Sequence, residues 1–251
     1  REAATAELTD ALRTLRVEAQ LPDAFPAEVE AEASRAIAAH ELPARDLTEL
    51  GFVTIDPAGA TDLDQAVAIE PDGSGWRVFY AIADLGSFVE PGGAIDAEAR
   101  ERGMTVYAAD GRIPLHPVAI SEGAASLLPG EERGAYVWEF ALDAAGRATS
   151  TTVGRARVRS RRQWTYDEAQ DALGSEPLVG MLRDVGEARL ALESERGGAS
   201  LAIPEILVER DDAGYRLRRR VLLPVESWNA QLSLLAGMEA ARLMLDGGIG
   251  I

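Results

Sequence analysis

The segment from Phe52 to Ala66 constrains this chain most, because it joins a buried strand to a sharp turn and a group of aspartates. The apolar run Phe52–Ile55 predicts a buried strand, and that strand delivers Asp56 at its end. Pro57 and Gly59 then predict a bend, since proline fixes φ and glycine adopts conformations that other residues avoid. The segment therefore predicts a strand and a turn that gather acidic side chains.

Asp62 and Asp64 follow the turn at a spacing of two, so an extended backbone would project both carboxylates from one face, with Leu63 on the other. Together with Asp56 they predict an oxygen-rich pocket of multiple negative charge. Such carboxylates repel one another, and a hard cation such as Mg²⁺ prefers oxygen ligands. The alternative is ordinary turn chemistry, in which aspartates beside proline and glycine cap backbone amides.

Composition limits the other possibilities. The chain has 251 residues, enough for one large domain or two small ones, and it contains no cysteine, which excludes disulfides and thiolate metal sites. It shows no apolar run of about 18 residues, so no membrane partner is expected. The N-terminus lacks the apolar region of a signal peptide, and a cytoplasmic location is the default.

The net charge of −17 argues against a generic nucleic-acid-binding protein, which is usually basic. A nuclease can still concentrate arginines along one channel, and every basic side chain here is arginine. Five arginines alternate along one segment and its end, where they either line an RNA path or form a solvated face: Arg155, Arg157, Arg159, Arg161 and Arg162.

The pattern along the chain predicts an α/β (α+β) fold, with a mixed, mainly antiparallel sheet flanked by helices and the aspartates at the bottom of a cleft. Helical periodicity covers about residues 1–20, 26–40, 96–102, 178–192 and 228–246, and Thr165 is a candidate N-cap of another helix. Strand patterns cover residues 52–55, 66–69, 76–82, 136–141, 148–159, 206–209 and 215–221.

The aspartate segment resembles the signature of the ribonuclease II/R family, the RNB domain, which reads roughly T-I-D, a short loop, then D-x-D-D-A. This chain has Thr54-Ile55-Asp56, followed by Asp62-Leu63-Asp64-Gln65-Ala66. Further short matches follow in the family's order, which makes the resemblance far more specific: Ile82-Ala83-Asp84-Leu85, Arg102-Gly103, Thr105-Val106-Tyr107, Arg112-Ile113-Pro114 and Ser126-Leu127-Leu128-Pro129-Gly130.

The resemblance covers roughly residues 21–245 and corresponds to the first part of one catalytic domain. We therefore expect a helical N-terminal segment over residues 1–45 and the N-terminal part of an RNB-like catalytic domain over residues 46–251. The family's later half and its oligonucleotide-binding barrels have no counterpart in this sequence, so further domains or chain segments are expected to complete the RNA channel.

The resemblance implies a 3′-to-5′ exoribonuclease that hydrolyses single-stranded RNA to nucleoside 5′-monophosphates with Mg²⁺, or alternatively Mn²⁺, as cofactor. It implies that Asp56, Asp62 and Asp64 are catalytic metal ligands. Tyr107 matches a tyrosine that stacks on bases near the RNA 3′ end, and Arg112 is a candidate phosphate contact. A core tyrosine and a solvated surface arginine are the alternatives for these two residues.

Gln65 stands where the family has its fourth aspartate. Its amide oxygen can coordinate a metal but brings no charge, so the sequence predicts that a second cation is bound more weakly or through water. Two rival functions follow: a catalytically weak or inactive RNB relative that binds RNA or a protein partner, and a different Mg²⁺ phosphodiesterase or structural domain. Metal-dependent release of mononucleotides distinguishes the exoribonuclease from both.

Overall fold

The computed structural model describes residues 2–22, 24–198, 203–211 and 214–250, which form two compact units. The smaller unit takes its described residues from Arg1–His40, Leu85–Ala124 and Ala202–Val221, and the larger from Glu41–Asp84, Ala125–Leu201 and Leu222–Ile251. The boundary predicted at residues 45/46 stays a prediction. The larger unit contains all of the aspartates of the predicted metal site.

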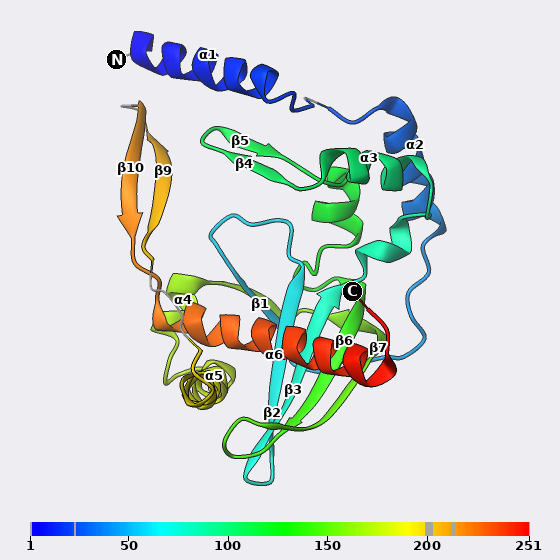
Figure 1. The fold of residues 1–251 in the computed structure, drawn as a ribbon, viewed down its shortest axis with the longest axis vertical. Coiled ribbons are helices and arrows are strands. Elements are labelled where there is room, and N and C mark those ends of the chain that lie inside the picture. The colour runs from blue at the N-terminus through cyan, green and yellow to red at the C-terminus, as the bar shows by residue number, and fades with distance from the viewer. Residues whose placement is uncertain (1, 23, 199–202, 212–213, 251) are drawn as a thin grey trace. The chain divides into compact units, whose positions relative to one another are not determined.

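The larger unit is built on a six-stranded sheet in the order β7-β6-β3-β2-β1-β8 (Figure 1). Its strands are β1 (Val53–Asp56), β2 (Gln65–Asp72), β3 (Gly75–Ala83), β6 (Glu132–Leu142), β7 (Ala148–Arg159) and β8 (Arg162–Thr165). All neighbouring strands are antiparallel except β1 and β8, which are parallel. The predicted mixed, mainly antiparallel sheet flanked by helices is confirmed.

Strand β8 is absent from the sequence-based prediction. It has only four residues and one buried apolar side chain, Trp164, so it shows no alternation to detect. The predicted N-cap directly after it is confirmed, because the Thr165 hydroxyl accepts a bond from the Glu168 amide while the Glu168 carboxylate accepts one from the Thr165 amide. The N-cap therefore marks both the end of β8 and the start of the next helix.

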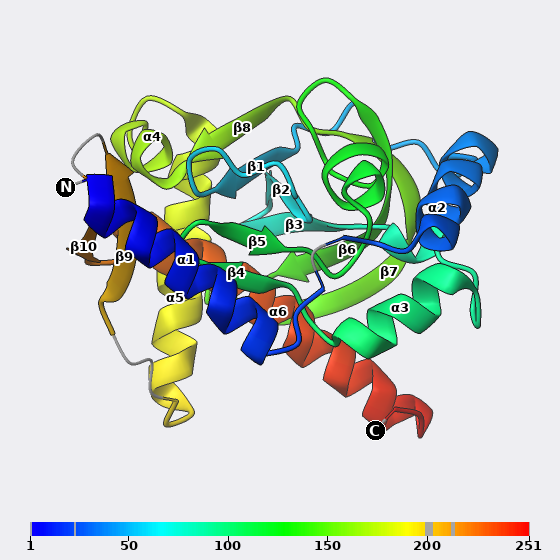
Figure 2. The same ribbon diagram turned by 90° about the horizontal axis from the view of Figure 1, so that it is seen from above.

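Three helices cover one face of the sheet (Figures 1 and 2): α4 (Tyr166–Asp171), α5 (Pro177–Glu195) and α6 (Pro224–Gly247). Their apolar side chains share a core with alternate residues of the strands, such as Ile55, Val67, Tyr80, Phe140, Leu182, Trp228 and Leu232. The other residues of the same strands face a second core around Phe52, Leu63, Ala66, Phe79, Leu127 and Val158. The central strands are thus buried on both faces, which fixes where their ends lie.

The smaller unit comprises α1 (Glu2–Glu18), α2 (Ala27–Ala39), η1 (Leu85–Phe88), α3 (Ala94–Arg102), the hairpin β4 (Val106–Ala108) and β5 (Gly111–Ile113), the π-helix η2 (Ala119–Ala124), and the hairpin β9 (Glu205–Asp211) and β10 (Gly214–Arg220). Arg102 ties its parts together. This nearly buried side chain bonds Glu98, the Pro114 carbonyl and the Ala24 carbonyl, and it lies 3.8 Å from the centroid of the Phe25 ring.

Among the described helices, none has the length and apolar composition needed to cross a membrane.

Helices α5 and α6 cross at a glycine, and this contact gives a test of the fold. A Cβ atom at Gly186 would lie 2.4 Å from the Cβ and 2.7 Å from the Cα of Trp228, whereas one at Gly180 of the same helix would meet nothing within 4 Å. We expect Gly186→Ala to lower the free energy of unfolding by about 1–3 kcal/mol through overpacking. Gly180→Ala should instead raise it by up to about 1 kcal/mol, because alanine is the better helix former.

Urea unfolding of both variants measures these changes. Equal effects of the two substitutions would contradict the close helix crossing.

Candidate active site

The turn after β1 has the geometry that its sequence predicts. The Ala60 amide donates to the Pro57 carbonyl at 3.1 Å, and Gly59 at the third position of this turn has φ of +81°. A positive φ at the third position is typical of a type II turn. Pro57 is the first residue of this turn and Ala58 is the second, the position that proline often occupies in such turns. The turn leaves Asp56 at the end of β1 and sends the chain back toward β2.

The segment that carries Asp64 is held from the inside. The Ser126 hydroxyl accepts a bond from the Leu63 amide at 3.0 Å and donates one to the Thr61 carbonyl at 2.7 Å. The Leu127 amide adds a bond to the Leu63 carbonyl at 2.8 Å. Leu63 is fully buried, so its side chain anchors the segment in the second core while Asp64 turns away from it.

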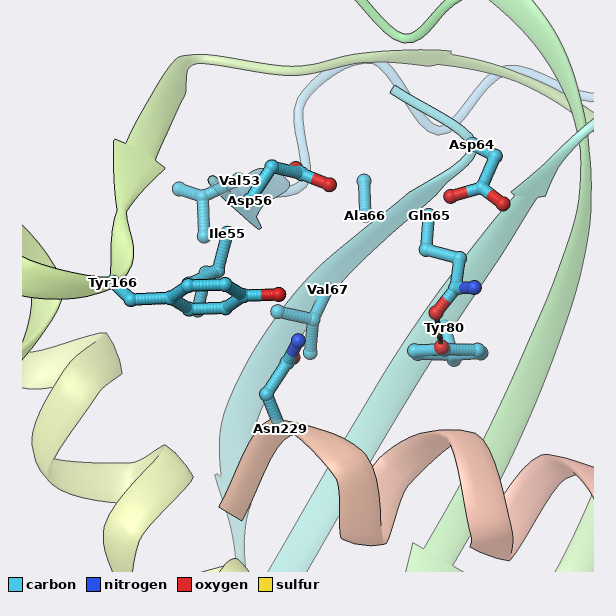
Figure 3. Close-up of a pocket in the computed structure, with 10 residues that line it drawn as sticks. All are labelled: Val53, Ile55, Asp56, Asp64, Gln65, Ala66, Val67, Tyr80, Tyr166 and Asn229. Carbon is cyan, nitrogen blue, oxygen red and sulfur yellow. Dashed lines mark hydrogen bonds between the residues drawn. The ribbon is translucent and has the colours of Figure 1, made fainter. Parts of the chain in front are cut away.

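Asp56 and Asp64 line one pocket of about 230 Å³, together with Val53, Ile55, Gln65, Ala66, Val67, Tyr80, Tyr166 and Asn229. Figure 3 shows the two carboxylates on either side of Ala66, both turned toward the same space. The end of β1 supplies one carboxylate and the segment before β2 supplies the other. Of the three aspartates that the sequence placed in a shared pocket, Asp56 and Asp64 therefore do line one, whereas Asp62 does not.

The environment of Asp56 disfavours its charged form. Burial, followed by the negative charges of Asp64 and Asp62, raises the pKa of Asp56 from 3.8 to about 6. Its Oδ2 atom is buried and has no hydrogen-bond partner in the described part of the chain. A buried carboxylate oxygen without a donor is costly, so this atom calls for a cation or a proton.

Asp64 reaches solvent, yet protein atoms crowd its carboxylate, and this burial raises its pKa. Hydrogen bonds from its own backbone and from the Gln65 side chain offset part of the rise, and the charge of Asp62 adds to it. Asp62 thus acts on both other aspartates but does not line the pocket. No set of three or more His, Cys, Asp or Glu side chains is arranged to hold a metal within the described residues.

The donor set still fits a divalent cation. Mg²⁺ in proteins is commonly held by one or two carboxylates, and waters and substrate phosphate oxygens complete its octahedron. Asp56 and Asp64 supply two such carboxylates on one pocket, and the unpartnered oxygen of Asp56 gives the cation a ligand that nothing else satisfies. The ligand roles of Asp56, Asp62, Asp64 and Gln65 stay predictions.

Sequence reasoning missed three polar residues of the pocket: Tyr80, Tyr166 and Asn229. Tyr80 lies in a segment with clear strand alternation, which could have placed it on one face of the sheet but not beside an aspartate. Its buried hydroxyl donates a hydrogen bond to Gln65 Oε1 (Figure 3), and burial raises the pKa of Tyr80 to about 12. Asn229 comes from α6, far along the chain.

The predicted RNA contacts Tyr107 and Arg112 belong to the smaller unit. They are cross-strand partners in the β4–β5 hairpin, so their side chains lie on the same face. Tyr107 is 71% exposed, which excludes the alternative of a core tyrosine, and Arg112 pairs with Glu122 at 2.6 Å. Their contact with RNA stays a prediction.

The arginines along β7 are largely ion-paired. Arg155 binds the buried Asp84 at 2.5 Å, and Arg157 binds Asp46 at 2.6 Å. Arg159 lies 3.5 Å from Glu49. Since each of these cations already has an acidic neighbour, the structure favours the charged surface face over an RNA path for this strand.

The fold and its carboxylate pocket define the class of this protein. The model of the family described as "RNB domain" matches residues 44–242, and the chain belongs to the RNB family. A relative named ribonuclease R from Acidithiobacillus ferrooxidans is 37% identical over 170 residues, which cover 68% of this chain and 39% of that protein. Ribonuclease R of Escherichia coli is 36% identical over 172 residues, 64% of this chain and 21% of that protein.

Among solved structures, ribonuclease R of Mycoplasma genitalium in complex with ribose methylated single-stranded RNA has the same fold, with a TM-score of 0.88 at 22% identity over 96% of this chain and 40% of that chain. The chain therefore spans two fifths or less of these relatives. A relative from Arabidopsis thaliana, 39% identical over 51% of this chain and 12% of that protein, is named "Inactive exonuclease DIS3L2".

The hydrogen bonds of the Ser126 hydroxyl with the Leu63 amide and the Thr61 carbonyl give a test of how the aspartate segment is held. Ser126→Ala leaves the buried Leu63 amide without its acceptor, and we expect the free energy of unfolding to fall by about 1–3 kcal/mol. Ser150→Ala is the matched control, since Ser150 is exposed on β7. Urea unfolding measures both variants. An equally small loss of stability in Ser126→Ala and Ser150→Ala would contradict a stabilising role of the Ser126 hydrogen bonds.

The raised pKa of Asp56 gives a test of the site's electrostatics. Its folded-state pKa of about 6 lies above the ordinary 3.8, so the folded protein holds this proton more tightly than the unfolded chain. Ionisation of Asp56 therefore removes stability as the pH rises from about 4 through 6. In chelator, we expect Asp56→Asn to raise the free energy of unfolding at pH 7.5 by about 1–2 kcal/mol, with solvent screening allowed for, and to have little effect at pH 4.5.

Asp46→Asn is the control of opposite sign. Hydrogen bonds from Thr48, the backbone amide first, lower the pKa of Asp46 to about 2, so its replacement should lower stability at pH 7.5. A gain for Asp56→Asn that is the same at both pH values would refute the charge explanation.

Proposed function

We propose that this chain forms the metal-binding part of an exoribonuclease that removes nucleotides from the 3′ end of single-stranded RNA as nucleoside 5′-monophosphates. The observation that carries the proposal is the pair of carboxylates, Asp56 and Asp64, on one pocket of a chain that belongs to the RNB family. The names of the relatives and the single-stranded RNA bound to the Mycoplasma genitalium protein support this substrate.

In this proposal Asp56 and Asp64 hold Mg²⁺ or Mn²⁺, and Asp62 adds negative charge to the site. When bound, such a cation neutralises charge on the scissile phosphate and lowers the pKa of the attacking water. The chain's own residues position the reacting groups. The end of β1 fixes Asp56, and the segment bonded by Ser126 fixes Asp64. Asn229 and the Tyr166 hydroxyl, which points into the pocket in Figure 3, offer hydrogen-bond donors to a phosphate oxygen.

The β4–β5 hairpin supplies the remaining RNA contacts in this proposal. Exposed Tyr107 stacks on a base, which is tolerant of sequence because every base has a π face. Arg112, on the same face of the hairpin, contacts a phosphate, and its pairing with Glu122 sets its orientation beforehand. Further domains complete the RNA channel, consistent with the small share of each relative that this chain spans.

Two observations favour a second function, that of a catalytically weak relative that binds RNA without turnover. Gln65 removes one negative charge from the position of the family's fourth aspartate, and a relative named as inactive matches this chain. Salt-dependent RNA binding without mononucleotide release would support this second function.

Asp64→Asn tests the leading proposal. In a preparation that contains the complete RNB domain, we expect the substitution to reduce mononucleotide release by at least about 100-fold, because a charged metal ligand is lost. RNA affinity should change by less than about threefold, since stacking and phosphate contacts elsewhere are untouched. Asp184→Asn, an exposed carboxylate on α5, is the control. Turnover of Asp64→Asn equal to that of the control would refute a metal role for Asp64.

A further inference from the structure

Three polar groups stand in a row at one side of the pocket: the Asp64 carboxylate, the Gln65 amide and the Tyr80 hydroxyl (Figure 3). The Tyr80 hydroxyl donates a hydrogen bond to Gln65 Oε1. At the other end of its side chain, Gln65 lies beside the Asp64 carboxyl, and its hydrogen bonding lowers the pKa of that group. Gln65 is therefore engaged at both ends of its amide, although it stands at the position where a metal ligand was predicted.

Hydrogen-bond chemistry fixes which end of the amide faces which partner. An ionised carboxylate only accepts, so the group of Gln65 that faces Asp64 is its NH₂. The carbonyl oxygen then faces Tyr80, where a hydroxyl is available to donate. The one atom of Gln65 that could bind a hard cation is thus already an acceptor, and it is turned away from Asp64.

We propose that Gln65 is a positioning residue and not a metal ligand: Tyr80 anchors its carbonyl, and its NH₂ holds the Asp64 carboxylate toward the cation. This inference rests on the proposed function, since it takes Asp64 as a ligand of the divalent cation. It changes the role of the residue at the family's fourth aspartate position from a charge to a hydrogen-bond donor.

Tyr80 is suited to anchor the amide. Its ring is 3% exposed in the core beneath the helices, and β3 holds it in register with Val67 of β2, two residues beyond Gln65. The pKa of about 12 keeps its hydroxyl protonated at neutral pH, so it remains a donor. A fixed donor of this kind orients the amide in one direction.

The arrangement also suits a site with three aspartates. A fourth carboxylate beside Asp64 would add to the repulsion that already raises the pKa of Asp56, whereas an amide donor stabilises Asp64 without adding charge. Partners behind a metal ligand of this kind commonly change metal affinity by about 10–100-fold when they are removed.

Mn²⁺ binding to the RNA-free protein tests the inference, with the free ion followed by electron paramagnetic resonance. Tyr80→Phe removes the hydroxyl that hydrogen-bonds Gln65 Oε1 and keeps the aromatic ring. We therefore expect the Mn²⁺ dissociation constant to rise about tenfold. If Gln65 were a ligand, the same substitution would free its oxygen and tighten binding. The two assignments thus predict opposite signs. Tyr136→Phe, on the neighbouring strand β6 and half exposed, is the matched control and should leave the constant unchanged.

A double-mutant cycle separates action through Gln65 from a general structural effect. Gln65→Ala should weaken Mn²⁺ binding by about the same factor as Tyr80→Phe, and the double variant should bind no more weakly than either single variant. Additive losses, tighter binding by Tyr80→Phe or an unchanged constant would each overturn the inference. Failure of the unsubstituted protein to bind Mn²⁺ would instead overturn the proposed function, so the two failures are distinguishable.

A second measurement needs no substitution, which covers the case in which Tyr80→Phe does not fold. In ¹³C-labelled protein titrated with Mg²⁺, we expect the carboxylate carbons of Asp56 and Asp64 to shift more than the side-chain carbonyl carbon of Gln65. A Gln65 shift as large as theirs would show coordination through its oxygen and overturn the inference.

Discussion

The mutual repulsion of Asp56, Asp62 and Asp64 is the interaction on which the rest of the site depends. In a flexible chain, three carboxylates would move apart into solvent. The fold keeps them together by restraining the backbone segments that carry them. The sheet fixes Asp56, because Val53, Thr54 and Ile55 of β1 are all buried and the strand cannot slide without exposing them. The inner bonds of Ser126 fix the other two. The larger unit thus holds buried, mutually repelling carboxylates together, which lowers its stability and creates a site that favours a cation.

Local patterns in the sequence were enough to predict much of this arrangement. The buried run Phe52–Ile55, the turn at Gly59 and the N-cap Thr165 depend on neighbours along the chain, and the structure contains each of them. Contacts between distant segments were beyond such reasoning. The parallel pairing of β8 with β1 and the presence of Asn229 in the pocket of Asp56 depend on how the chain folds back, and no residue pattern near either position encodes them.

The same distinction explains Gln65. From the sequence it was a residue that departs from a motif, and its only visible property was the missing charge. Its partner Tyr80 lies on the next strand, and strand alternation alone gives it a core role. The pairing of β2 with β3 brings the Tyr80 hydroxyl to the Gln65 amide. The residue that departs from the motif thus has a hydrogen-bond partner that the sequence alone did not indicate. A substitution at a motif position is thus best judged with its neighbours in space.

The bond between Leu63 and Ser126 joins residues 63 positions apart, which has a consequence for synthesis of the chain. A polypeptide emerging from the ribosome has its aspartates long before it has the serine that orders them, and Asn229 arrives later still. During synthesis the acidic segment therefore emerges before the serine whose hydroxyl bonds its backbone, and it gains these bonds only when Ser126 follows.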